Sequence, residues 1–420
     1  MNASETSLAL TLLGALLTAP LTQAAPALPG SQLPGGADSW KLTWSDEFDY
    51  PDAQLEENWI SQNSGSTHIL SSRWRENAMV SNGTLKLLNK KQKRGGNDWT
   101  SGNVWTKQHF QYGYFECRYR YAAAEGTNNS FWIMTNTPQP AGKKAFEIDI
   151  NEGHYPNEIN TNIHNHSDVI VVNGRKTHPS SSKSFAFGIR PDVTIQLEIP
   201  ITTRRIRLTS NHQSHFHLGE FRIFNVNPTG YPEPLSKSAE SDKPGLVNFA
   251  KDSKIKTSGF YKNGADTSQN LIDGDLSKRW ITQSDGTKSV EFTFPEKRRI
   301  GCVQFVSGWQ ENGRWKAMMD NYRVEYHNGQ KWVEMAKFDI LDGDHNFARD
   351  FHTYGLKWSP QELVFYFNGK EIRREKNQFC HQAAPVWLSL AIIGWGGKIT
   401  DAIDGTFMEI DYVRIYQPKP

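Results

Sequence analysis

The feature that most constrains the fold is a long succession of short runs in which apolar and polar residues alternate. From Trp40 onward these runs are separated by Gly, Asn and Pro turns, as where Ser81-Asn82-Gly83 precedes Thr84 to Leu88. Phe115 to Tyr121 alternates between two faces in the same way. No stretch of about ten residues or more follows the 3.6-residue period of an amphipathic helix. Many short strands at regular spacing predict an all-β sandwich.

One of these runs, Glu147-Ile148-Asp149-Ile150-Asn151-Glu152, carries three carboxylates within six residues. Strict alternation places Glu147 and Asp149 on the polar face of a strand and Glu152 on the opposite face. A β-bulge between Asp149 and Glu152 adds one residue and returns Glu152 to the polar face. Hydrolysis of a glycosidic bond with retention needs two carboxyl groups about 5–5.5 Å apart. A bulged strand is therefore a candidate catalytic site, and a solvated strand edge is the alternative interpretation of the same acids.

Several other runs, in the same order along the chain, resemble glycoside hydrolase family 16 in its bulged form. They are Trp44 to Phe48, Tyr112 to Glu116, Ser130 to Met134, Asp350 to Trp358 and Glu409 to Tyr416. The resemblance covers most of residues 40–190 and 345–417. It implies a concanavalin-like β-jelly roll of two curved sheets, with a substrate groove across the concave face.

The resemblance also implies roles for individual residues. Glu147 is expected to be the nucleophile, Glu152 the acid and base, and Asp149 the carboxyl between them that keeps one neighbour neutral and the other ionised. Trp132 is expected to form a sugar platform beside the cleaved bond. His164, on the strand after the acids, is expected to face the sugar, with a structural histidine as the alternative.

Further substrate contacts are predicted from residue type. Flat indoles pack against the C–H faces of sugar rings, so Trp74, Trp105 and Trp395 are further platform candidates, each with a place in the core as the alternative. Arg73 is a candidate contact for a sulfate or carboxylate group, because guanidinium binds such anions through two parallel hydrogen bonds.

Residues 190–340 interrupt the family pattern. Asp192 to Phe224 resembles the last strands of a discoidin-type module, the class that includes many carbohydrate-binding modules, whereas Asn270 to Trp332 resembles its beginning and middle. We interpret this segment as one circularly permuted module inserted in a loop of the enzyme, because sandwich modules with neighbouring termini tolerate both changes. Two degraded copies are the alternative.

The resemblance to that module also implies a structural Ca²⁺ held by oxygen ligands from Asp273, Asp275 and Glu220. A hydrogen-bonded Asp-Gly-Asp turn explains the two aspartates equally well. No cofactor is expected for the hydrolysis itself.

The remaining segments set the domain boundaries. Residues 1–25 resemble a secretory signal peptide although they lack a basic start, residues 26–39 are expected to be a disordered leader, and the jelly roll is expected to comprise 40–189 and 341–420. We therefore expect a secreted or periplasmic protein.

Charge and cysteine content limit the partners. The chain has 47 Lys and Arg against 45 Asp and Glu, a balance that gives no support for a nucleic-acid partner, and we expect a monomer that does not bind membranes. Cys117 and Cys380 could pair in an exported protein, with buried free thiols as the alternative.

Taken together, these features predict a retaining endo-hydrolase of a β-linked polysaccharide, most closely an agarose, porphyran or carrageenan hydrolase. A β-1,3-glucanase, or laminarinase, is the second interpretation. A non-catalytic carbohydrate-binding protein is the third.

Overall fold

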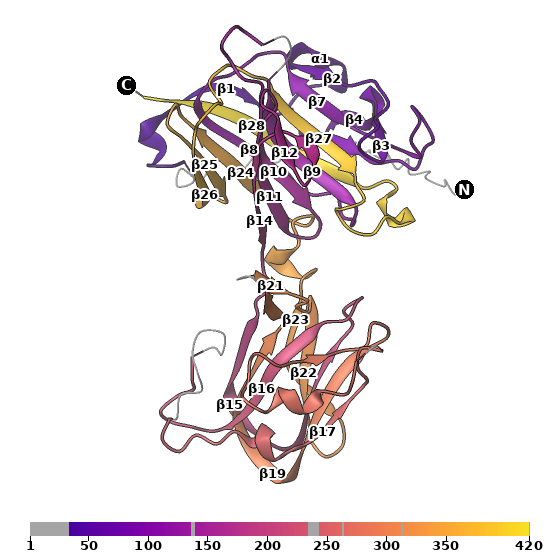
Figure 1. Ribbon diagram of the computed structural model, residues 1–420, viewed down its shortest axis with the longest axis vertical. Helices are drawn as coiled ribbons and strands as arrows, with labels where there is room; N and C mark the ends of the chain where they lie inside the picture. The colour runs from indigo at the N-terminus through magenta and orange to yellow at the C-terminus, as the bar shows by residue number, and fades with distance from the viewer. Residues whose placement is uncertain (1–32, 136–138, 234–242, 263, 312–313, 420) are drawn as a thin grey trace, which may run out of the picture.

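The computed structural model describes residues 33–135, 139–233, 243–262, 264–311 and 314–419 (Figure 1). The expected signal peptide and residues 26–32 of the expected leader lie outside these ranges. The described chain is all-β, as predicted, and its α-helical content is the single turn α1 (Leu55–Asn58). The short 3₁₀ turns are η1 (Ala37–Ser39), η2 (Asp52–Gln54), η3 (Arg75–Asn77), η4 (Phe249–Asp252), η5 (Ser268–Leu271), η6 (Gly343–His345) and η7 (Asp401–Ile403).

Two antiparallel sheets form the first body of the molecule, which is the upper part of Figure 1. In spatial order the first sheet contains β26 (Lys370–Lys376), β25 (Glu362–Phe367), β24 (His352–Trp358), β8 (Gly113–Arg120), β28 (Phe407–Pro418), β5 (Thr84–Leu88) and β4 (Ala78–Ser81), with β1 (Trp40–Asp46) also paired to β28. The second contains β14 (Ser180–Ala186), β11 (Glu158–Asn165), β10 (Phe146–His154), β9 (Thr127–Met134), β27 (Val386–Ile392), β7 (Asn103–Thr106) and β2 (Trp59–Ser61). A short parallel pair, β3 (Ser71–Arg73) and β6 (Trp99–Ser101), flanks them.

The core lies between these two sheets. Phe146 of β10 meets Trp358 of β24 with ring centroids 5.6 Å apart, so side chains of the two inner faces interdigitate. Residues before and after the interruption contribute to this one core. The body is the β-jelly-roll sandwich that the family pattern implied.

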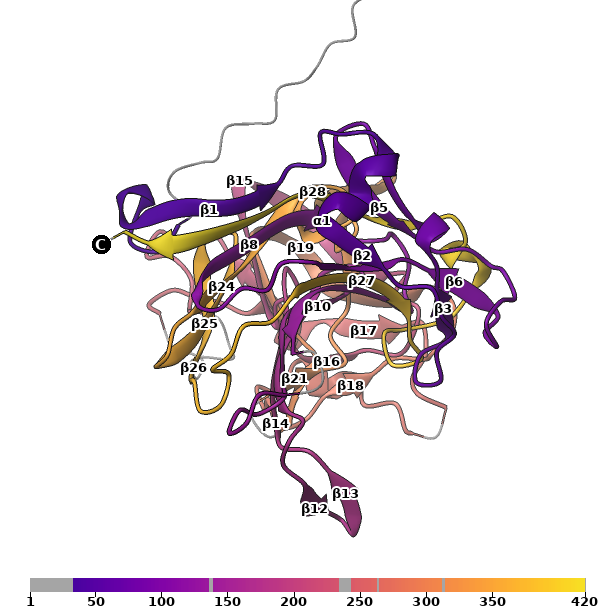
Figure 2. The same ribbon diagram turned by 90° about the horizontal axis from the view of Figure 1, so that it is seen from above.

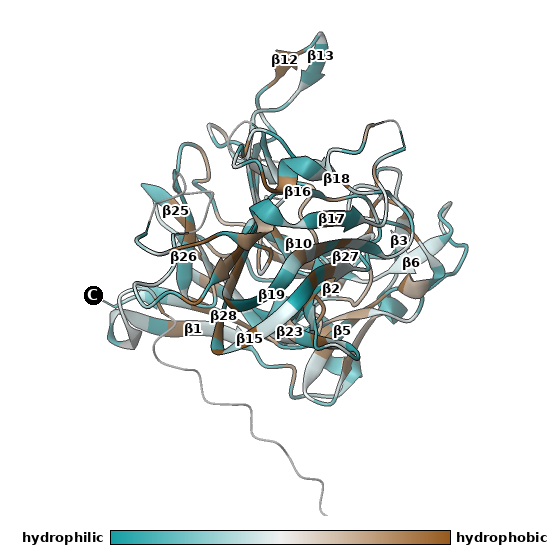
Figure 3. Cartoon of the chain, turned by 90° about the horizontal axis from the view of Figure 1, so that it is seen from below, coloured by the Kyte–Doolittle hydropathy of each residue, from teal (hydrophilic) through white to brown (hydrophobic). Residues whose placement is uncertain are grey.

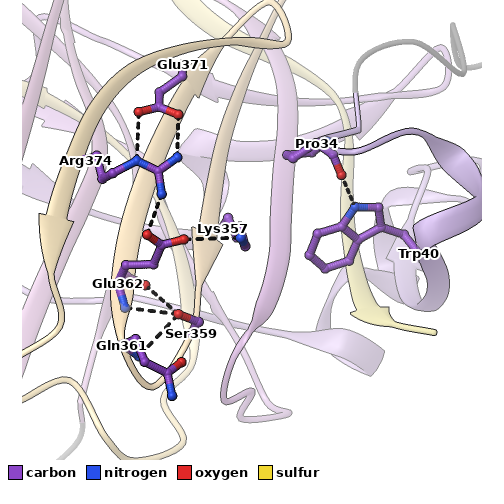
Figure 4. Close-up of polar contacts among 8 residues, drawn as sticks. All are labelled: Pro34, Trp40, Lys357, Ser359, Gln361, Glu362, Glu371 and Arg374. Carbon is purple, nitrogen blue, oxygen red and sulfur yellow. Dashed lines mark hydrogen bonds and ion pairs between the residues drawn. The ribbon is translucent and has the colours of Figure 1, made fainter. Parts of the chain in front are cut away.

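The edge of the first sheet is strongly charged. On β25 and β26, Arg374 donates two hydrogen bonds to Glu371 (3.0 and 2.7 Å) and also pairs with Glu362, which lies 3.2 Å from Lys357 (Figure 4). Exposed pairs of this kind contribute little stability. A row of charges on an edge strand does, however, disfavour pairing with a strand from another molecule.

Residues 33–39 contact the first sheet through Trp40. The indole N–H of Trp40 donates to the carbonyl of Pro34 at 2.6 Å (Figure 4), and Leu33 packs against the same aromatic cluster. The buried tryptophan thus provides an apolar anchor for this part of the segment that the sequence predicts to be a leader.

A second body, the lower part of Figure 1, comprises the strands between Asp192 and Asp339. Its main sheet contains β18 (Trp280–Ile281), β16 (His217–Asn225), β19 (Lys288–Ser307), β15 (Asp192–Ser210), β22 (Asn321–His327) and β23 (Trp332–Asp339), with β17 (Lys254–Thr257) paired to β19. The small pair β20 (Trp309–Glu311) and β21 (Arg314–Lys316) lies beside it.

This body has its own core. The long strands β15 and β19 pair along most of their length but are interrupted by bulges, and the two halves of the ribbon fold over one another. Phe221 consequently stacks on both Phe305 in one half and Phe292 in the other, at 5.4 and 4.6 Å. Residues from 206–223 and from 250–324 share this single core.

All three cysteines, Cys117, Cys302 and Cys380, are free and buried, so of the two alternatives for Cys117 and Cys380 the structure shows the unpaired thiols. Within the described ranges, no helix has the length and apolar character needed to span a bilayer.

Candidate active site

The predicted bulge in β10 is confirmed. Asp149 pairs with Asn162 of β11, whereas Glu152 pairs with Asn160, so three steps along β10 match two along β11. The same irregularity occurs against β9. The extra residue restores the outward direction of Glu152, because side chains alternate with a period of two.

Asn151 explains why the bulge is stable. Its side chain is fully buried and its amide donates to the phenolic oxygens of Tyr119 and Tyr121 at 2.6 and 2.8 Å. A polar group in the core is tolerated when it is hydrogen-bonded in this way. The residue that breaks the alternation is therefore held inside the sandwich while Asp149 and Glu152 face outward.

Glu147 is held next to two histidines. Nε2 of His166 lies 3.0 Å from Oε2 of Glu147, and because an ionised carboxylate only accepts, the imidazole N–H donates. Burial opposes ionisation of Glu147, but the hydrogen bond from His166 and the charge of the imidazoles of His164 and His166 outweigh it. The pKa of Glu147 therefore lies below its ordinary value.

Asp149 is the most buried of the three acids, with 2% of its surface exposed. Burial and the negative charges of Glu152 and Glu147 raise its pKa well above the ordinary value. His164 approaches it, with Nε2 3.4 Å from Oδ2, and Glu147, Asp149 and His164 bring polar atoms within 4.8 Å of one another. The environment of Asp149 thus favours its protonated form, next to Glu147, whose environment favours the ionised form.

Glu152 has a different environment from Glu147. Its two oxygens accept from the side-chain amides of Asn128 at 2.6 Å and Asn162 at 2.7 Å, and these donors are neutral. Burial, together with the charge of Glu147, raises the pKa of Glu152 despite those hydrogen bonds. Two carboxyl groups on one strand thus have pKa values moved in opposite directions, which is what an acid and a nucleophile require.

Beside the acids, three indoles form a continuous stack across neighbouring strands. Trp132 of β9 stacks on Trp387 of β27 at 4.9 Å, and Trp387 stacks on Trp105 of β7 at 4.5 Å. The indole N–H of Trp132 donates to Ser389 at 3.1 Å, which fixes the ring. Trp132 and Trp105 thus lie on the same outer face as the acids, since Trp132 pairs with Asp149.

The remaining substrate candidates lie elsewhere. Trp74 is covered on one side by Arg94, whose guanidinium carbon is 3.6 Å from the ring centroid. Trp395 follows β27 and is 66% exposed. Arg73 is 7% exposed on β3, its Nε has no hydrogen-bond partner among the described residues, and burial lowers its pKa to about 10. No described contact joins Arg73 to the acids.

Sequence reasoning missed several members of this site. The sequence pattern did not single out Trp387, which lies in the buried strand β27, as a site residue. It did not single out His178 either, although its Nε2 lies 2.9 Å from Nδ1 of His164. Asn128 and Asn162 were not assigned to Glu152. Alternation along each strand gives the outward face, but only the register between strands shows which residues become neighbours.

The expected calcium ligands lie in the second body. Glu220 is fully buried and accepts the backbone N–H of Gly274 at 3.0 Å, between the two aspartates. Asp273 and Asp275 each lie 3.3 Å from Nζ of Lys278, and Asp273 accepts the backbone N–H of Asp275 at 2.9 Å. These contacts are those of the Asp-Gly-Asp turn that was the alternative, and calcium binding stays a prediction.

The chain matches the model of glycosyl hydrolases family 16 over residues 67–187 and 283–414. More than half of the chain is covered, and the protein therefore belongs to this family. The second matched range begins inside the second body and ends within β28.

Individual relatives are more distant. The chain is 29% identical to kappa-carrageenase of Pseudoalteromonas carrageenovora over 183 residues, which are 39% of this chain and 45% of that protein. It is 31% identical to a beta-glucanase of Rhodothermus marinus over 149 residues, 32% of this chain and 52% of that protein. The chain spans about half or less of the curated relatives it matches. Among solved structures, the laminarinase of Flavobacterium sp. UMI-01 aligns with 90% of this chain and 100% of its own, at 14% identity and a TM-score of 0.43.

Proposed function

We propose that the protein is a retaining endo-hydrolase of a β-linked polysaccharide. The observation that carries the proposal is the bulge in β10, which gathers three carboxyl groups on one face and leaves the pKa of Glu147 lowered and that of Glu152 raised. Membership of family 16 supports the same reaction.

In the proposed mechanism, ionised Glu147 attacks the anomeric carbon and forms a covalent glycosyl-enzyme. Protonated Glu152 donates its proton to the departing glycosidic oxygen and then removes a proton from the attacking water. Asp149 keeps its proton directed at Glu147, which disperses negative charge when three acids share one face. Trp132 holds the sugar ring at the reacting bond, and His164 contacts it from the other side.

For the substrate we favour a red-algal galactan: agarose, porphyran or carrageenan. The similarity to a kappa-carrageenase supports this choice, and we interpret the segments Phe110 to Tyr114 and Asn160 to His164 as resembling those of marine galactanases. A β-1,3-glucan is the second candidate, because relatives named beta-glucanase match the chain at comparable identity. A non-catalytic carbohydrate-binding protein is the third.

Other parts of the proposal follow from the sequence pattern. We place the protein outside the cytoplasm, because residues 1–25 resemble a signal peptide. We assign the second body to a discoidin-type carbohydrate-binding module, with the structural Ca²⁺ described above, and we expect a monomer.

The experiment is a reducing-sugar assay on agarose, porphyran, κ-carrageenan and laminarin. Wild-type protein should release sugar from one of the galactans, and Glu147→Gln should lose more than about a thousandfold in kcat. Glu158→Gln is the matched control, since Glu158 begins the neighbouring strand and has no described contact with the acids. Release from laminarin alone would favour the glucanase, whereas retained binding without any release would favour the binding protein. The size of the first products then separates endo from exo action.

A further inference from the structure

A β-hairpin projects from the first body, as Figures 2 and 3 both show. It consists of β12 (Ile170–Val172) and β13 (Arg175–Thr177), joined by Asn173-Gly174. Both turn residues have positive φ, 51° and 76°, as a tight two-residue hairpin turn requires. The hairpin is thus a defined structure rather than a loose loop.

The three residues of β12 and Val169 just before it expose four consecutive aliphatic side chains. The exposed fractions of Val169, Ile170, Val171 and Val172 are 69%, 40%, 66% and 49%. Alternation puts Ile170 and Val172 on one face of the ribbon and Val169 and Val171 on the other, so both faces present apolar surface. A two-stranded hairpin with neither face covered is only marginally stable in water. We therefore expect a bound partner to cover this hairpin.

The second strand of the hairpin is cationic. Arg175 pairs with Val172 and Lys176 with Val171, so each face carries one cation beside its aliphatic residues. Both cations are exposed, and the described residues provide neither of them with a carboxylate partner. A surface of this kind fits a partner that presents apolar C–H groups next to negative charges.

The base of the hairpin is fixed directly against the acids. His166, just before it, contacts Glu147 at 3.0 Å, and His178, just after it, lies 2.9 Å from His164. The imidazoles of His166 and His178 lie 4.6 Å apart. The base of the hairpin is therefore separated from the carboxyl group of Glu147 by a single side chain, that of His166.

We propose that residues 169–177 form an arm that holds a sulfated polysaccharide chain where it leaves the catalytic acids. This inference rests on the proposed function and narrows its substrate class from red-algal galactans in general to the sulfated ones. Sugar rings supply the C–H faces for the aliphatic residues, and sulfate esters supply the charges for Arg175 and Lys176. Because the base of the arm contacts the catalytic acids, a substrate chain bound at the acids can extend along the arm, and we therefore prefer the polysaccharide to other partners.

A second copy of the chain fits less well. A stable protein interface involves about 20–30 residues on each side, and the arm offers nine. The exposed Lys176 and Arg175 on the ribbon also disfavour strand-to-strand association.

The test compares three proteins: wild type, the apolar variant Val169→Ser/Val171→Ser and the charge variant Arg175→Gln/Lys176→Gln. The matched control is Ile199→Ser, because Ile199 is 81% exposed on β15 of the second body. For porphyran and κ-carrageenan, each arm variant should raise KM about five- to tenfold with little change in kcat, because two exposed contacts are lost. For the shortest oligosaccharide that wild type cleaves, kcat/KM should not change, since such a chain does not reach the arm.

The charge variant gives the sharper result. Its loss should be confined to the sulfated polymers, whereas any cleavage of agarose or laminarin should continue at the wild-type KM. An unchanged KM on sulfated polymers, or equal losses on the polymer and the shortest oligosaccharide, would overturn the inference. So would a wild-type dimer that becomes a monomer in the apolar variant, because the occupant would then be a second copy.

Affinity electrophoresis separates this inference from the proposed function. If wild type hydrolyses none of the four polymers, the proposed function fails, but gels containing porphyran or κ-carrageenan still test the arm. Weaker retardation of the arm variants than of wild type and Ile199→Ser, each measured against a gel without polymer, supports it, and equal retardation of all four proteins overturns it. Thermal unfolding of each variant shows that the fold is retained.

Discussion

The buried amide of Asn151 offers the most direct test of how the catalytic strand is built. Replacing Asn151 by alanine removes two hydrogen bonds, of 2.6 and 2.8 Å, to Tyr119 and Tyr121 in the core. Each buried hydrogen bond contributes about 1 kcal/mol net, and more is lost when a partner is left unsatisfied. Both phenols keep a second contact, with the backbone oxygens of Asn129 and Glu158. The expected loss is therefore about 2 kcal/mol of unfolding free energy.

The effect of Asn151→Ala on activity should exceed its effect on stability. In the alanine variant no hydrogen bond to Tyr119 and Tyr121 holds residue 151 inside the core. A one-residue slip of the strand would then turn Glu152 toward the core. A displacement of about 1 Å in a catalytic group already costs on the order of a hundredfold in rate. We expect kcat to fall at least that far under conditions where the variant is folded.

Urea unfolding and steady-state kinetics measure the two effects on the same preparation. Tyr119→Phe serves as the paired variant: in that background Asn151→Ala should cost about 1 kcal/mol less, because one of its two partners is already absent. If Asn151→Ala were within about 0.5 kcal/mol of wild type and kept its kcat, the argument that this amide maintains the bulge would be refuted.

Three further predictions concern the acids and the indole stack. In a pH–rate profile, activity should fall as the pH drops through the lowered pKa of Glu147, because the nucleophile must be ionised. Activity should also fall as the pH rises through the raised pKa of Glu152, because the acid must hold its proton. With an activated aryl glycoside as substrate, Glu152→Gln should remove this alkaline limb. Asp149→Asn should lose about tenfold in kcat and Asp149→Ala about a hundredfold or more, because an amide N–H can replace the donor of a protonated carboxyl, and equal losses would contradict that protonation state. Trp387→Ala should cost about 3–5 kcal/mol in urea unfolding, because an indole stacked on both sides is lost, whereas a cost below about 1 kcal/mol would show that the stack is not structural.

The alternating pattern of the chain was enough to determine its class and the location of the acids. Side chains on a strand alternate strictly, so an all-β fold, the outward direction of Glu147 and Asp149, and the need for a bulge before Glu152 all follow from local geometry. The polar face of β11 follows in the same way, with Asn162 and His164 on the side of the acids.

Only the tertiary structure decided which residues meet across strands and why the bulge persists. Trp387 lies on β27, Asn128 on β9 and His178 just after the hairpin. Their proximity to the acids depends on strand order and register, which no local pattern encodes. Asn151 looks like an ordinary polar position in sequence, and the two phenols that make it a core residue come from β8 of the other sheet and from the residue that follows β8. The physical reason is the same in each case: alternation acts between neighbouring residues, whereas pKa values, hydrogen-bond partners and stacking depend on which strands the fold places side by side.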